Sequence, residues 1–189
     1  MLRFWILAFG LLVFQSAVKA DGAQEAEFWQ ALQTGGKVLL MRHAEIDRSF
    51  GDSFLLDESC FSEKNLNEIG RNQAKSVNQA FKMHGIKIDK VLASPHCRTK
   101  ETAELAFGRY QVEPLLRLTK ALTVEKANDN LQKLRLMIGE YRGQGNLILV
   151  THRPNIGELA LIRVEPAEML VLQPLGDGLF DVIARLKLQ

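Results

Sequence analysis

The segment Val38-Leu39-Leu40-Met41-Arg42-His43 combines an apolar run with two polar residues that follow it directly. The apolar run comes after the pair Gly35-Gly36, and a short continuous run of this kind is typical of a β-strand buried on both faces. The same pattern recurs at residues 91–93 and 147–150. We therefore expect three buried strands that lie side by side in one sheet.

Helical periods separate these strands. Apolar residues recur at spacings of three or four over residues 66–81, before Gly85, and over residues 124–141, after Thr123 as N-cap. A short helix is predicted at residues 25–34. Residues 168–173 and 179–186 flank Gly176-Asp177-Gly178, which favours a hairpin. The fold class predicted is a three-layer α/β/α sandwich with a mostly parallel central sheet and a C-terminal edge strand or hairpin.

Cationic and donor side chains follow all three buried runs. Arg42 and His43 follow the first, Arg98 the second and His152 the third. Ligands bind beyond the carboxyl ends of strands in open parallel sheets, so these side chains are expected to converge there. Two helices are predicted to open at the same edge, near Arg98 and at Pro154, and to aim free N–H groups at it. The set suits a dianionic phosphate.

With these residues the sequence resembles the histidine phosphatase superfamily, the group related to phosphoglycerate mutase. Four segments carry the resemblance, in the order expected for the family, from about Val38 to His152. They are residues 40–45 (LMRHAE), 66–74 (LNEIGRNQA), 94–103 (SPHCRTKETA) and 150–152 (VTH).

The resemblance implies a two-step phosphoryl transfer without a metal or other cofactor. His43 would be the nucleophile and would carry the phosphoryl group as a phosphohistidine that water hydrolyses. Arg42, Arg98 and His152 would bind the phosphoryl oxygens. To attack, His43 needs one unprotonated ring nitrogen, with the other held by an acceptor such as a backbone carbonyl.

The chain departs from the family pattern at two places. Many members carry a proton-donating Glu two residues beyond an Arg-Leu pair, and after Arg117-Leu118 that place is Lys120. Glu125 ranks first among the possible substitutes, although a carboxylate also suits the first turn of a helix. Glu45 and Asp47 are the other candidates, and Glu45 could instead pair with Arg48. Arg153 follows the second histidine where many members have Gly, which adds a cation near the pocket or forms a salt bridge.

Other polar residues receive plainer interpretations. His96 could line the pocket entrance, but a solvent-facing position is the expectation. Ser94 lacks the Gly-x-Ser-x-Gly environment of a serine nucleophile. The four histidines have no ligand spacing typical of zinc. Residues 47–62 show no clear periodicity and are expected to form a loop over the active face.

The first 20 residues resemble a secretory signal peptide. Arg3 precedes an apolar stretch from Phe4 to Phe14, which is shorter than the roughly 20 residues that span a bilayer, and Val18 and Ala20 are small residues before a cleavage site. We expect residues 21–189 to form one domain, periplasmic or secreted. Removing Arg3 and Lys19 from the 24 basic residues leaves 22, against 22 acidic residues, so no charge excess favours nucleic acid or an anionic membrane.

Export changes how the two cysteines are interpreted. In an oxidising compartment Cys60 and Cys97 could form a disulfide, and otherwise they would be buried thiols. Their spacing is not that of a metal or redox site.

Together these observations predict an exported phosphohydrolase that cleaves a small-molecule or envelope-attached phosphate monoester through His43. One rival is a non-catalytic module that binds a phosphate ligand and has lost turnover with its acid. A phosphomutase is the less favoured rival, since its glycolytic substrates are intracellular.

Overall fold

Six strands form one sheet at the centre of the computed structural model, which describes residues 22–188. The predicted signal peptide lies outside the described residues. In spatial order the strands are β3 (Gln111–Val112), β2 (Ile88–Ala93), β4 (Asn146–Thr151), β1 (Val38–Arg42), β5 (Met169–Gly176) and β6 (Leu179–Leu186). The first four are mutually parallel, β5 runs antiparallel to β1, and β6 runs antiparallel to β5. The mostly parallel sheet and its C-terminal hairpin are as predicted.

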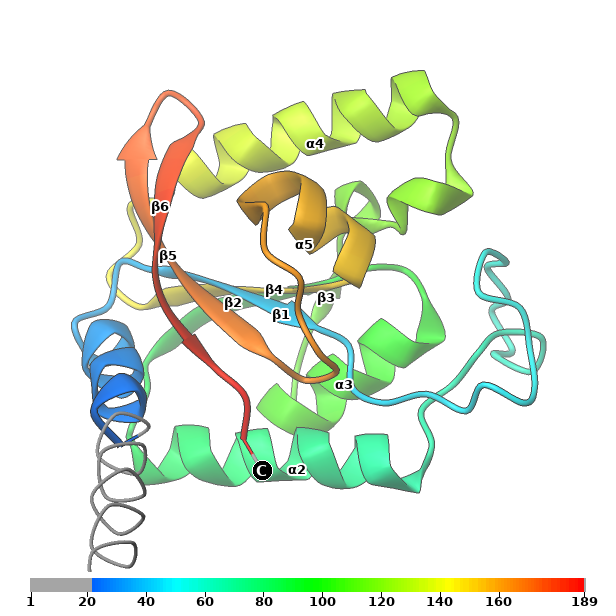
Figure 1. The fold of residues 1–189 in the computed structure, drawn as a ribbon, viewed down its shortest axis with the longest axis horizontal. Helices are drawn as coiled ribbons and strands as arrows, with labels where there is room; N and C mark the ends of the chain where they lie inside the picture. The colour runs from blue at the N-terminus through cyan, green and yellow to red at the C-terminus, as the bar shows by residue number, and fades with distance from the viewer. Residues whose placement is uncertain (1–21, 189) are drawn as a thin grey trace, which may run out of the picture.

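Helices cover both faces of this sheet (Figure 1). Residues 22–33 are helical and lie on one face with α2 (Glu68–Met83) and α3 (Cys97–Phe107), and α4 (Val124–Gly139) and α5 (Arg153–Ala160) lie on the other. Two 3-10 turns, η1 (Pro114–Leu116) and η2 (Thr119–Ala121), precede α4. The three-layer arrangement predicted from the sequence is therefore observed.

The apolar run of β1 is continuous because both of its faces are buried. Leu39 and Met41 pack into the core beneath α2 and α3, whereas Val38 and Leu40 pack into the core beneath α4 and α5. All four side chains are fully buried. Alternate residues of one strand thus hold the two helical layers together.

Local signals account for where the predicted helices begin. Thr123 caps α4 as expected, since its Oγ1 accepts from the N–H of Lys126 at 3.3 Å. Helix α2 begins at Glu68 rather than Leu66, because the Oδ1 of Asn67 accepts from the N–H of Gly70 at 2.8 Å and makes Asn67 the N-cap.

Residues 47–62 contain no helix or strand, as predicted, and make only an isolated bridge from Asp52 to Glu63. A disulfide joins Cys60 at the end of this loop to Cys97 at the start of α3. Within residues 22–188, no helix combines the length and the apolar character needed to cross a membrane.

Candidate active site

The carboxyl ends of β1 and β4 bring two histidines together. His43 follows β1 and His152 follows β4, and their ring centroids lie 5.5 Å apart. Arg98, in the first turn of α3, donates from Nη2 to Nδ1 of His152 at 3.3 Å. These three side chains are 6%, 1% and 2% exposed, respectively. Residues separated by more than fifty positions therefore share one buried site.

The hydrogen bond of His43 fixes its tautomer. Its Nδ1 lies 2.8 Å from the carbonyl oxygen of Ala44. Because a carbonyl only accepts, Nδ1 must carry the proton, and in the neutral ring Nε2 keeps its lone pair. The acceptor that the sequence could not identify is therefore the next residue of the chain.

Helix α2 holds the backbone just beyond His43. Gly70 packs so closely that a Cβ there would lie 2.0 Å from the carbonyl oxygen of Glu45. Gln73, one turn later, accepts from the N–H of Glu45 at 2.9 Å. Thr102 of α3 accepts from the N–H of Ala44 at 3.1 Å. The Gly, Gln and Thr of the sequence motifs thus position the backbone directly after His43.

The two neighbours of His152 assign its tautomer as well. Arg98 can only donate, so Nδ1 of His152 accepts, and Nε2–H must be the donor to Oγ of Ser94 at 2.8 Å. Arg98 also donates to the carbonyl of Ser53 at 3.0 Å. Loop residues 47–62 therefore reach over the site, in agreement with the prediction for this loop.

Arg42 lies at the edge of this group. It is partly buried, and its Nη1 donates to the carbonyl of Val164 at 3.0 Å. Burial and then Arg153 lower the pKa of Arg42, while Glu165 and Glu45 raise it.

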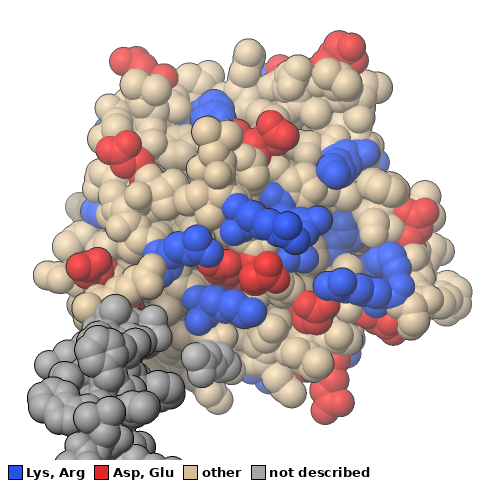
Figure 2. All heavy atoms as spheres, in the orientation of Figure 1, with Lys and Arg blue, Asp and Glu red and all other residues tan. Residues whose placement is uncertain are grey.

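Figure 2 shows lysine and arginine side chains gathered over α5 and the segment after it, with acidic side chains among them. Arg153 is exposed and forms no salt bridge with the described residues, so it adds a cation at the rim.

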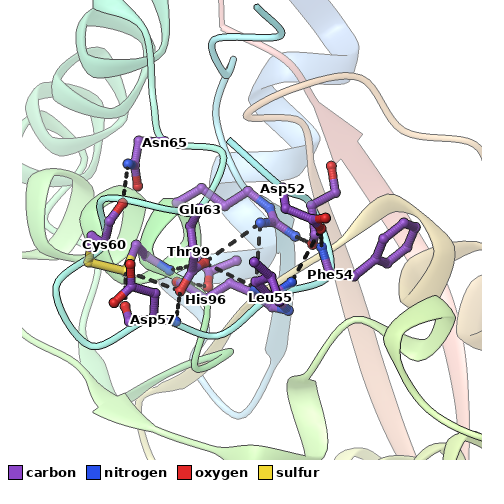
Figure 3. Close-up of polar contacts among 12 residues, drawn as sticks. Asp52, Phe54, Leu55, Asp57, Cys60, Glu63, Asn65, His96 and Thr99 are labelled. Carbon is purple, nitrogen blue, oxygen red and sulfur yellow. Dashed lines mark hydrogen bonds and ion pairs between the residues drawn. A yellow bond between two sulfur atoms is a disulfide. The ribbon is translucent and has the colours of Figure 1, made fainter. Parts of the chain in front are cut away.

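The buried pair Glu63–His96 is a part of the site that sequence reasoning missed. Glu63 Oε2 lies 3.1 Å from Nδ1 of His96, and both side chains are almost fully buried (Figure 3). The ring centroid of His96 is 4.9 Å from that of His152. The expectation that His96 faces solvent was wrong, because the loop folds Glu63 over it and buries the ring completely.

The predicted proton donor, Glu125, is exposed in the first turn of α4. Within residues 22–188 no hydrogen bond or ion pair joins it to Arg42, His43, Arg98 or His152. The other candidates have local partners, since Glu45 pairs with Arg48 at 3.2 Å and Asp47 accepts from Ser49. A role for Glu125 stays a prediction.

Burial keeps the histidines of the site neutral. It lowers the pKa of His43 to about 3, and Arg98 adds to the effect. Burial also lowers the pKa of His152 well below its usual value and that of Arg98 to about 10. At neutral pH the site therefore holds neutral imidazoles beside guanidinium groups, which combines a nucleophile with an anion-binding surface.

Known proteins share this arrangement of elements. Residues 38–122 match the model of the histidine phosphatase superfamily, branch 1. No match to a curated protein sequence was found. Among solved structures, the protein histidine phosphatase SixA complexed with tungstate superposes with a TM-score of 0.60 at 18% identity, over 80% of this chain and 96% of that one.

Two further structures are similar at comparable identity. The phosphoglycerate mutase of Thermus thermophilus gives a TM-score of 0.56 at 17% identity, over 81% of this chain and 99% of the mutase. The ecdysone phosphate phosphatase of Bombix mori, in complex with tungstate, gives 0.57 at 15% identity, over 78% of this chain and 92% of the phosphatase. At these identities the neighbours establish the fold, and residues 38–122 are the part of the chain that matches the histidine phosphatase superfamily.

Proposed function

We propose that the protein is an exported phosphohydrolase that cleaves phosphate monoesters through a phosphohistidine on His43. The observation that carries the proposal is the hydrogen bond from Nδ1 of His43 to the carbonyl of Ala44, which leaves Nε2 unprotonated beside Arg98 and His152. A buried neutral imidazole next to a guanidinium is equipped both to attack phosphorus and to stabilise the charge that develops. Tungstate, which is bound in two of the similar structures, is a tetrahedral oxyanion like phosphate.

The reaction has two steps. Nε2 of His43 attacks phosphorus, the P–O bond to the alcohol breaks, and the phosphoryl group is transferred to the ring. Arg42, Arg98 and His152 bind the three phosphoryl oxygens during the transfer, and His152 does so by turning its Nε2–H from Oγ of Ser94 to the phosphate. Water then attacks phosphorus, the P–N bond breaks, and inorganic phosphate leaves. The carbonyl of Ala44 stabilises the positive ring as the N–P bond forms.

The substrate proposed is a small-molecule or envelope-attached phosphate monoester, and the compartment is the periplasm or the exterior. The disulfide between Cys60 and Cys97 supports an oxidising compartment, because such bonds are rare in reducing ones. The signal-like composition of residues 1–20 supports export independently.

Turnover of p-nitrophenyl phosphate by residues 21–189, compared with His43→Asn, tests this function. The asparagine variant removes Nε2 and should lose both phosphate release and the labelled phosphohistidine, which is trapped at alkaline pH. Equal release by the two proteins refutes the nucleophile. Binding of tungstate without turnover by the wild-type protein favours the binding module, and label that moves between positions of a sugar phosphate without phosphate release favours a mutase.

A further inference from the structure

Two nitrogens of the site residues, Nε of Arg42 and Nε2 of His96, are buried without a hydrogen bond among residues 22–188. His96 is 0% exposed, and its Nε2 is a buried polar atom without a hydrogen bond among residues 22–188. Leaving such a group unpaired is unfavourable, so a native protein that keeps one needs a reason. A partner that arrives with the substrate is such a reason.

Glu63 determines which nitrogen of His96 is free. The Glu63 carboxylate accepts from the N–H of Cys97 at 3.0 Å and from the N–H of Asp57 at 3.1 Å, and it lies 3.9 Å from Nη1 of Arg98. A carboxylate surrounded by donors accepts from Nδ1–H of His96 at 3.1 Å. Nη1 of Arg98 also lies 3.5 Å from this Nδ1, a long contact that would need the opposite tautomer, so the shorter bond to Glu63 decides.

His96 lies one ring away from His43, with His152 between them. His96 occupies the N-cap position of α3, as His152 occupies that of α5, and neither side chain bonds to its helix. The two rings meet nearly at right angles with centroids 4.9 Å apart. On its other side His152 meets His43 at 5.5 Å. His96 is also among the groups that lower the pKa of His43, after burial, Arg98 and Arg42.

We propose that His96, held by Glu63, is the proton donor to the leaving group during phosphoryl transfer to His43. The proposal rests on the proposed function and names a further catalytic residue for it. As the P–O bond breaks, the leaving oxygen takes the proton from Nε2 of His96 and departs as the alcohol. In the second step the attacking water gives a proton back to the same Nε2, and phosphate leaves His43. Glu63 holds Nδ1–H throughout and is a positioning residue.

The pKa of His96 depends on the charges around it, and a bound phosphate changes those charges. In the empty site burial lowers the pKa of His96 to about 4, with contributions from Arg98 and Arg117 that Glu63 opposes. His152, the remaining titratable neighbour, is neutral. A bound phosphate dianion offsets the guanidinium charge, which raises the pKa of His96 and favours the imidazolium that donates.

The test compares leaving groups in His96→Asn. Asparagine keeps an amide N–H that can bond Glu63 but has nothing in place of Nε2. General acid catalysis typically contributes 10²- to 10⁴-fold, so turnover of a simple alkyl phosphate should fall by about that factor. Turnover of p-nitrophenyl phosphate, whose leaving group hardly needs a proton, should fall less than about tenfold. Equal losses on both substrates, or no loss on either, overturn the proposal.

The wild-type protein provides a second readout that does not depend on how the variant folds. With an internal donor, kcat should depend only weakly on the basicity of the leaving group across a series of aryl and alkyl phosphates, and a steep dependence rejects the donor.

The variant Glu63→Gln tests the positioning residue. Activity should be lost at a lower pH than in the wild-type protein as the pH rises, because the carboxylate that raises the pKa of His96 is gone. An unchanged pH profile limits Glu63 to a structural role and counts against the proposal that Glu63 and His96 act together.

Glu125→Gln is the matched control for the rival donor. It should leave the ratio of alkyl to aryl turnover unchanged, and a selective loss of alkyl turnover assigns the donor to Glu125 instead. Turnover that requires His43 but shows no leaving-group effect in His96→Asn refutes the donor alone. Absence of turnover in the wild-type protein refutes the proposed function and this proposal together.

Discussion

Gly70→Ala tests how closely α2 packs against the backbone that follows His43. The new Cβ would lie 2.0 Å from the carbonyl oxygen of Glu45 and 2.9 Å from its carbonyl carbon and nitrogen. Alanine gains about 1 kcal/mol over glycine in a helix, but overpacking costs about 1–3 kcal/mol, and here the obstacle is backbone that cannot rotate away. At the upper end of that cost the net destabilisation is about 2 kcal/mol.

Urea unfolding followed by circular dichroism measures this change, and Gly157→Ala in α5 is the control. A Cβ at Gly157 meets nothing within 4 Å, so the same substitution should stabilise there by up to about 1 kcal/mol. Gly70→Ala should also lower kcat, because Glu45 follows the residue whose carbonyl holds His43. If Gly70→Ala is as stable as wild type or more so, the close packing of α2 on Glu45 is refuted.

Three further outcomes are expected. The pKa of His43 is about 3 in the folded chain and about 6.5 when unfolded, so the unfolded state binds a proton first as the pH falls. The free energy of unfolding therefore decreases by about 1.4 kcal/mol for each pH unit below 6.5 for each such histidine. His43→Asn should flatten the dependence of Tm on pH between 6.5 and 4, and parallel curves would contradict the assignment. The Cys60→Ser, Cys97→Ser double variant should lose about 4 kcal/mol of its free energy of unfolding, because the disulfide closes a loop with a sequence separation of 37. An unchanged urea midpoint would show that the loop is ordered without the bond. Arg98→Lys should weaken tungstate binding about 10- to 100-fold by calorimetry, because one charge replaces a two-pronged donor, and equal affinity would remove Arg98 from the anion site.

The sequence predicted the parts of the site that follow buried strands. Continuous apolar runs are recognisable without a structure, and the residue after each run is fixed at one edge of the sheet, which is why His43 and His152 could be placed together. Arg98 was placed because it opens a helix after such a run. In each case a local pattern determines a position in space.

Glu63 and His96 could not be placed in this way. Glu63 directly follows the segment without periodicity, residues 47–62, and a single glutamate in a polar stretch looks the same in sequence whether it is solvated or buried. One signal was available, since pairing Cys60 with Cys97 brings the residues just after the first cysteine next to those around the second. Had the disulfide between Cys60 and Cys97 been assumed, Glu63 would have been predicted to lie near His96.

Strand β1, which precedes His43, is synthesised long before the two strands that pair with it. Strand β1 ends at Arg42, but its two neighbours, β4 and β5, begin at Asn146 and Met169. During synthesis β1 therefore stays an unpaired apolar segment until more than a hundred further residues have emerged, and pairings of such long range form slowly. A chain that cannot pair its central strand until β4 and β5 have been made depends on protection from aggregation until then.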